Sequence, residues 1–144
     1  MAIFRQIGAL ITCPYYLTYL AESHLQDGRF EQGLASVAEA RGISETNLSR
    51  NSEPELLRLK GELLARTRRE DAEAHLRSAL DLARAQGAAL FELRSAVALA
   101  RLLKEEDRFR EARALLTETT TRLPPALLDL PEGQTARDLM SSSR

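Results

Sequence analysis

Apolar residues recur at intervals of three and four positions along most of the chain, and short polar stretches interrupt them. Such spacings place side chains on one stripe of an α-helix, which turns once about every 3.6 residues. The prolines, glycines and polar clusters mark where each helix begins and ends. The predicted helices span residues 3–12, 14–26, 30–41, 53–67, 70–86, 88–106 and 108–122.

One arrangement of small and large side chains occurs three times along the chain. The first helix of each copy contains a small residue, which is Ala21, Gly61 or Ala100. Four positions before it lies an apolar residue, a leucine in the first two copies and an alanine in the third. Another small residue, such as Gly33, lies near the start of the second helix. Small residues let two helices approach closely, and large ones fill the groove between them. The repeated unit is therefore predicted to be an antiparallel helix pair.

This arrangement resembles the tetratricopeptide (TPR) repeat, a helix-turn-helix unit of about 34 residues. The turns at 27–30 and 107–109 resemble the turn between the two helices of that family, with an aromatic residue in the usual place, whereas 68–70 is shorter and has none. The resemblance implies an all-α, right-handed superhelix of three helix pairs over 14–122. A helix within 1–13 would precede them, and a short cap with a frayed tail over 123–144 would follow.

Residues 6–121 also resemble the C-terminal repeat region of large bacterial signalling ATPases that carry a class III nucleotide cyclase or a transcriptional activator domain. Segments 59–64 and 86–94 carry most of this resemblance. It implies that the chain corresponds to a detached C-terminal part of such a protein. The activity of the family's catalytic domains does not transfer to this sequence, which does not contain them.

The segment 3–12 resembles the tail of a helix from a preceding repeat. It carries five large apolar residues: Ile3, Phe4, Ile7, Leu10 and Ile11. Two outcomes stay open. The segment either folds down on the first helix pair, or remains exposed and joins two copies of the chain as a homodimer.

Two further stretches have less regular patterns. Residues 42–52 are polar, with two asparagines and several serines, and are predicted to be a mobile linker that ends where Ser52 and Pro54 start a helix. After Pro124 and Pro125, the leucines Leu127, Leu128 and Leu130 are expected to fold back as a cap.

Chain length, net charge and cysteine content limit which classes of protein and partner the sequence allows. A chain of 144 residues is long enough for one domain, and its net charge of −1 gives no overall attraction to nucleic acid or to an acidic membrane. One cysteine excludes an intramolecular disulfide. No apolar run is long enough to span a bilayer, and we expect the protein to be cytoplasmic.

Catalytic and metal-binding motifs are absent from the sequence. The two histidines, His24 and His75, do not form a ligand pair, and there is no phosphate-binding loop or nucleophile motif. We therefore expect no enzyme activity, no metal and no cofactor. An unrecognised enzyme stays an alternative, which a cleft with several perturbed titratable groups would support.

The family resemblance assigns a binding groove to the first helix of each pair. The candidate groove residues are Tyr15, Glu22, Arg58, Glu62, Arg66, Arg94, Arg101 and Lys104. The basic members would make the later half of the groove positively charged and suited to an acidic peptide, because arginine matches the geometry of carboxylates. The other interpretation is a solvated helix face with ion pairs such as Glu62 with Arg66.

The expected function is a non-catalytic module for protein-protein interaction. A small-ligand sensor of a transcriptional regulator is the first alternative. It would need an aromatic pocket, for which Tyr15, Tyr16, Tyr19 and Phe91 are the available residues.

Overall fold

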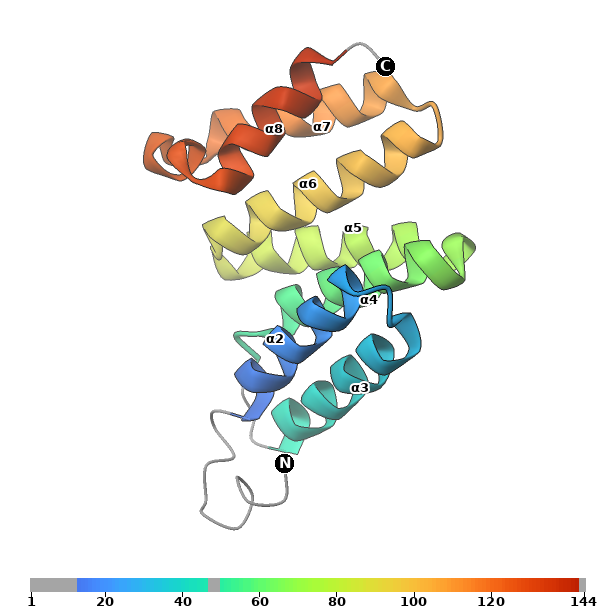
Figure 1. The fold of residues 1–144 in the computed structure, drawn as a ribbon. Helices are drawn as coiled ribbons and strands as arrows, with labels where there is room; N and C mark the ends of the chain where they lie inside the picture. The colour runs from blue at the N-terminus through green and yellow to red at the C-terminus, as the bar shows by residue number, and fades with distance from the viewer. Residues whose placement is uncertain (1–12, 47–49, 143–144) are drawn as a thin grey trace.

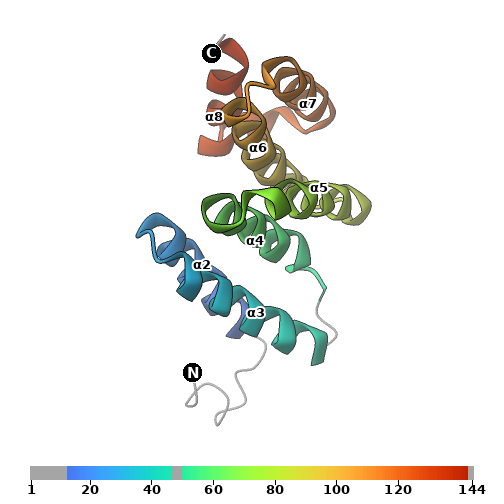
Figure 2. The ribbon, with the colours of Figure 1, turned by 90° about the vertical axis from the view of Figure 1, so that its right-hand side faces the viewer.

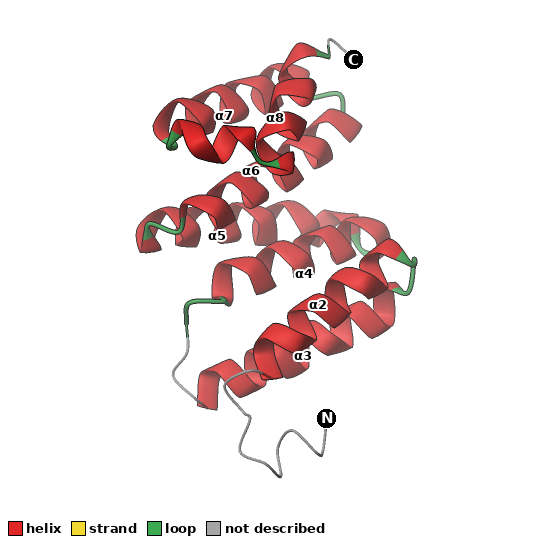
Figure 3. Ribbon diagram, turned by 60° about the vertical axis from the view of Figure 1, so that its left-hand side comes forward, coloured by secondary structure: helices red, strands yellow, loops and turns green. Residues whose placement is uncertain are grey.

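The computed structural model describes residues 13–46 and 50–142, and every regular element within them is helical (Figure 3). The all-α class is therefore confirmed for these residues, whereas the predicted helix over 3–12 and its apolar face lie outside them. The elements are α2 (Cys13–Gln26), α3 (Phe30–Thr46), α4 (Glu53–Thr67), α5 (Arg69–Gln86), α6 (Ala89–Glu105), α7 (Phe109–Arg122), the 3-10 helix η2 (Pro125–Asp129) and α8 (Pro131–Ser141).

Consecutive helices pack in pairs: α2 with α3, α4 with α5, and α6 with α7. The pairs follow one another along the length of the molecule, with α2 and α3 at one end and α7 and α8 at the other (Figures 1 and 2). Within the described residues, no helix is both long enough and apolar enough to cross a membrane.

The turns of the first and third pairs share one backbone geometry. Gly28 has φ 73° and Asp107 has φ 61°, so both occupy the left-handed region that glycine and aspartate tolerate best. In each turn the next residue donates its backbone N–H back to the first helix, from Arg29 to His24 O at 2.8 Å and from Arg108 to Leu103 O at 2.9 Å. The similarity of these two sequence segments thus extends to their hydrogen bonds.

The end of α5 follows directly from a glycine. Gly87 has φ 65°, and its N–H lies 3.1 Å from Arg84 O while the next amide, of Ala88, lies 2.9 Å from Ala83 O. Glycine adopts this left-handed conformation without strain and so ends helices readily. The predicted helix end at residue 86 is therefore confirmed.

Two glycines allow helices to approach closely. A Cβ placed on Gly61 of α4 would lie 2.6 Å from Cγ of Leu76 on α5, and one on Gly33 of α3 would lie 2.6 Å from Cδ2 of Leu63 on α4. Gly61 thus sits at the contact within a pair, and Gly33 at the contact between pairs. At Gly61 an added carbon would meet the branch carbon and the backbone of Leu76, whereas at Gly33 it would meet the flexible end of Leu63, which can shift. The repeated pattern predicted small residues at both positions.

In the part of the chain that the structure describes, the hydrophobic core consists of two clusters that meet on α4. Leu59 and Leu63 of α4 pack with buried residues of α2 and α3, whereas Leu64 packs into a larger cluster formed by α5, α6, α7 and α8. Leu34 of α3 contacts both clusters. Apolar side chains thus pack each helix pair against the next.

The prediction of a linker over 42–52 is wrong for its first part, because α3 continues to Thr46. A glycine inside a helix costs about 1 kcal/mol relative to alanine, which made Gly42 a plausible stop. The helical turn after Gly42 offsets this cost, since Ile43 packs on the smaller core cluster and Ser44 is buried.

The predicted short cap is instead η2 followed by α8, an 11-residue helix. Its Ala136, Leu139 and Met140 pack on the larger core cluster, while Leu130 stays exposed. The tail predicted to be frayed begins at Ser141, which still belongs to α8, and its last two residues lie outside the described part of the chain.

Candidate binding groove

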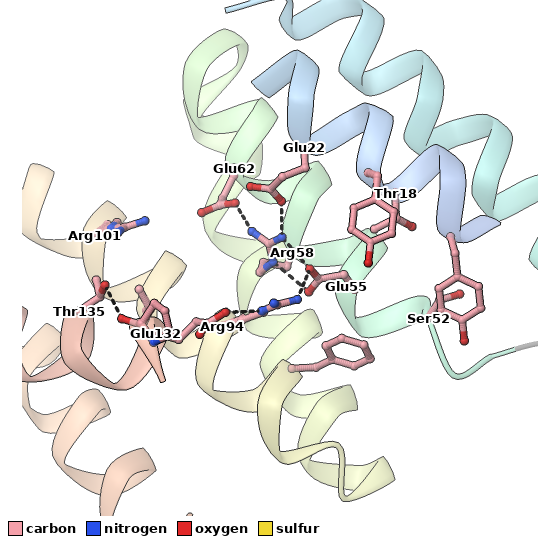
Figure 4. Close-up of a pocket in the computed structure, with 15 residues that line it drawn as sticks. Thr18, Glu22, Ser52, Glu55, Arg58, Glu62, Arg94, Arg101, Glu132 and Thr135 are labelled. Atoms are coloured by element: carbon pink, nitrogen blue, oxygen red, sulfur yellow. Dashed lines mark hydrogen bonds and ion pairs between the residues drawn. The ribbon is translucent and has the colours of Figure 1, made fainter. Parts of the chain in front are cut away.

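A concave groove of about 530 Å³ runs across one face of α2, α4, α6 and α8 (Figure 4). The first helix of each pair contributes residues at spacings of three or four, so each helix turns one stripe toward the groove. Fifteen side chains line it: Tyr15, Thr18, Tyr19, Glu22, Ser52, Glu55, Arg58, Glu62, Phe91, Arg94, Val97, Arg101, Pro131, Glu132 and Thr135.

The structure brings six of the eight candidate groove residues together. These six are Tyr15, Glu22, Arg58, Glu62, Arg94 and Arg101. Arg66 lies in a neighbouring hollow, 3.9 Å from Glu105. Lys104 donates to the backbone oxygens of Leu139 and Ser142 at 3.1 and 3.2 Å, so it fastens the end of α8 instead of facing the groove.

Arg58 is the centre of the groove floor. Only 8% of its side chain is exposed, and three carboxylates surround its guanidinium. Its Nε and Nη2 donate to the two oxygens of Glu55 at 3.0 and 2.7 Å, Nη2 also donates to Glu22 at 2.7 Å, and Nη1 donates to Glu62. Glu22 belongs to α2, so this cluster ties α2 to α4.

Arg94 of α6 extends the same network toward α8. Its Nη1 donates to Oε1 of Glu55 at 3.2 Å and its Nε donates to Oε1 of Glu132 at 2.9 Å. Glu55, itself almost fully buried, therefore accepts from two arginines. The floor is an internal ion network that links four helices, as the dashed lines of Figure 4 show.

The expectation of a positively charged later half is not met. Among the described lining residues, α4, α6 and α8 contribute three carboxylates and three guanidiniums, so this part of the groove is neutral. Two of the expected cations, Arg66 and Lys104, lie elsewhere, and Glu55 and Glu132 offset the charge of Arg94. Among the residues that the structure describes, Arg101 is the lining arginine that forms no hydrogen bond or ion pair.

Crowding of three carboxylates around one guanidinium perturbs both kinds of group. Burial raises the pKa of Glu62, and attraction to Arg58 offsets this only in part because Glu22 and Glu55 repel its charge. Burial by itself would lower the pKa of Arg58, but the hydrogen bond to Glu55 and the nearby carboxylates raise it above its ordinary value. Arg58 thus stays charged, and the raised pKa of Glu62 favours its protonated form.

A contrasting cluster lies on the outer side, where Arg108 pairs with Glu73 and Glu111 at 2.7 Å. Hydrogen bonds from Arg108 hold the pKa of both carboxyl groups below the ordinary value. Here water screens the charges, so these exposed pairs contribute little to stability.

Titration of the side-chain carboxyl carbons by NMR is expected to separate the two clusters. Glu62 should titrate above the ordinary value of 4.5, and Glu73 and Glu111 below it. Because the folded-state pKa of Glu62 is raised, its contribution to stability grows as the pH falls through that pKa, by up to about 1.4 kcal/mol per pH unit. A Glu62 midpoint below that of Glu73 would contradict the burial of its carboxylate in the network.

The sequence predicted only part of the lining. Tyr19 and Phe91 were expected only as aromatic residues available to a small-ligand pocket, together with Tyr15 and Tyr16; both line the groove, whereas Tyr16 does not. Their helical spacing from Tyr15 and Arg94 could also have placed them among the groove residues. Glu132 and Thr135 carried no such signal, because the helix that presents them was itself not predicted.

Thr18 and Thr135 donate their hydroxyls to the backbone oxygens of Pro14 and Pro131. Among the described residues, no three His, Cys, Asp or Glu side chains lie close enough together to hold a metal ion. The groove therefore presents aromatic rings, carboxylates and one unpaired arginine.

No protein-family model matches the chain, and no curated protein or solved structure is significantly similar to it.

Proposed function

We propose that this chain is a non-catalytic protein-interaction module of the TPR type, whose groove binds a segment of a partner protein. The observation that carries the proposal is the groove itself, an open concave surface to which one helix of every pair contributes. The family resemblance of the sequence supports the same assignment, including the right-handed superhelix.

Exposed aromatic side chains on the groove wall support a binding role. Tyr15 and Tyr19 are 52% and 76% exposed, although most large apolar side chains of the described residues are buried. Tyrosine is enriched among the residues that dominate binding energy at protein interfaces. Two tyrosines on one wall of a hollow are a suitable anchor for a bound segment.

The ion network supports binding without chemistry. Its carboxylates and arginines are already paired with each other, so the floor is rigid and a bound segment would not need to order it. Among the described lining residues there is no histidine, cysteine or lysine to act as a base or nucleophile. The shifted pKa values of Glu62 and Glu132, which would be the signal of an enzyme, are accounted for by burial and by their ion pairs with Arg58 and Arg94.

A small-ligand sensor is the second candidate, and the size of the groove favours it. A volume of about 530 Å³ falls within the range of about 300–1,000 Å³ typical of small-molecule sites. Tyr15, Tyr19 and Phe91 supply the aromatic lining that such a ligand would need.

Selection of 12-residue peptides from a random library on the immobilised protein tests the proposal. Selected peptides are expected to bind the intact chain and to lose about fivefold or more in affinity with Tyr15→Ala, measured by fluorescence anisotropy. Arg113→Ala, an exposed change on α7 outside the groove, is the matched control and should leave the affinity unchanged.

Equal binding to Tyr15→Ala, Arg101→Ala and the control would place the binding surface outside the groove. If no peptide is enriched, the interaction proposal fails. A small aromatic compound that raises the melting temperature of the intact chain but not of Tyr15→Ala would then favour the sensor.

A further inference from the structure

We infer that the bound segment places a lysine or arginine side chain against the α2 wall, defined here as Tyr15, Tyr19 and Glu22. This inference rests on the proposed function, because it concerns the chemistry of the segment that occupies the groove. It reverses the sign expected from the sequence, which pointed to an acidic partner.

The distribution of charge along the chain is the first argument. Helix α2 contains no lysine or arginine, and residues 13–46 carry five carboxylates against two arginines, Arg29 and Arg41. Arg29 pairs with Asp27 at 2.6 Å and Arg41 pairs with Glu53 at 2.8 Å, both away from the groove lining. The α2 end of the molecule is therefore negatively charged, although the whole chain is nearly neutral.

Free acceptor oxygens are the second argument. Glu22 is 37% exposed and uses Oε2 for Arg58, so its Oε1 receives no hydrogen bond from any described residue. Glu62 also accepts from Arg58 through Oε2, and its Oε1 has no hydrogen-bond donor in the described part of the chain. Arg101 already attracts the charge of Glu62, however, so Glu22 is the more available of the two. Arg58 is buried between them and already donates to Glu55, so it does not serve these remaining oxygens. A cation from a partner can donate hydrogen bonds to these oxygens.

The tyrosines are the third argument. Tyr15 and Tyr19 are one helical turn apart, and Glu22 follows Tyr19 by three positions, so the three side chains share one face of α2. A tyrosine ring attracts a lysine ammonium or an arginine guanidinium placed over its face. An exposed aromatic face beside a carboxylate is therefore complementary to a basic side chain.

The arginines of α6 define where the basic side chain can lie. Arg94 is offset by Glu55 and Glu132, so it repels a cation only weakly. Arg101 attracts the carboxylate of Glu62 on α4, and in Figure 4 it lies on the opposite side of the groove from Thr18 of α2. A basic side chain is thus restricted to the α2 wall, while the unpaired Arg101 is free to bind a carbonyl or carboxylate elsewhere on the same segment.

The selected peptides provide the test. They are expected to share a lysine or arginine, and replacing it by glutamine should weaken binding about two- to fivefold, with a similar loss for the Tyr19→Ala and Glu22→Gln variants. Once Glu22 is glutamine, the peptide substitution should have a smaller effect. Glu31→Gln on α3 makes the same charge change outside the groove lining and is the control.

The outcomes separate the two proposals. Peptides that bind the groove, lose affinity with Tyr15→Ala and carry no basic residue overturn this inference but keep the proposed function. Enrichment of acidic peptides that depend on Arg101 also overturns it. Failure to enrich any peptide overturns both. The glutamine substitution is made in the peptide, so this comparison does not depend on how well any protein variant folds.

Discussion

Replacing Arg58 by methionine is expected to lower the free energy of unfolding by about 3–5 kcal/mol at pH 7. The substitution leaves Glu55, with only 7% of its side chain exposed, dependent on Arg94 alone, and removes the cation that Glu22 and Glu62 share. Removing one partner from a buried ion cluster is strongly destabilising, because the remaining charges stay out of contact with water and have lost their counter-ion. Urea unfolding followed by circular dichroism measures the change.

The size of this loss should depend on pH. Burial raises the pKa of Glu62, and without Arg58 the attraction that opposes this rise is lost, so the folded variant binds protons more readily than the unfolded chain does. Its deficit should therefore shrink between pH 7 and pH 5. Arg113→Met, which removes an arginine that forms no ion pair among the described residues, should stay within about 0.5 kcal/mol of the parent. An equal deficit for Arg58→Met at both pH values would contradict the ion network.

A leucine at Gly61 is expected to destabilise the chain by about 1–3 kcal/mol or more. Even the first added carbon would meet Leu76 Cγ at 2.6 Å and the backbone nitrogen of Leu76 at 3.2 Å. Neither atom is the free end of a side chain, so α4 and α5 would have to separate. Thermal unfolding of Gly61→Leu measures the cost.

Gly42→Ala provides the matched control within a helix. A Cβ at Gly42 meets no atom within 4 Å, so the substitution should stabilise α3 by about 0.5–1 kcal/mol through the helix propensity of alanine. Unchanged stability in Gly61→Leu would mean that the close contact of α4 with α5 does not exist as described.

Most helix boundaries could be predicted because local chemistry sets them. Pro54 with Glu53 and Glu55 in the first turn begins α4, and Gly87 ends α5, so both ends were correct from the sequence. The end of α3 could not be predicted, because Gly42 is a poor helix residue and only tertiary packing of Ile43 keeps the helix intact. For the same reason α8 was missed, since its apolar residues have a partner surface only once α6 and α7 are folded.

The groove could be predicted in outline but not in charge. Periodicity and the family resemblance together placed Tyr15, Arg58 and Arg94 on one surface, and the structure brings them together. Whether an arginine is free or paired depends on which carboxylate lies opposite it on another helix. The approach of Glu132 from α8 and of Glu55 toward Arg94 has no signature in the sequence, and these contacts cancel the positive charge that the sequence predicted for this part of the groove.

The unequal division of the core on α4 has a consequence for motion. Among the described residues, the cluster that holds α2 and α3 has seven buried members, against sixteen in the cluster of the later helices. Local unfolding begins where the least apolar surface is buried, so the amide hydrogens of α2 and α3 should exchange with solvent through smaller openings than those of α6. A segment held between α2 and α6 would add its own contacts to this weaker end. Binding of the segment should therefore slow the exchange of amide hydrogens in α3, a helix that the segment does not contact.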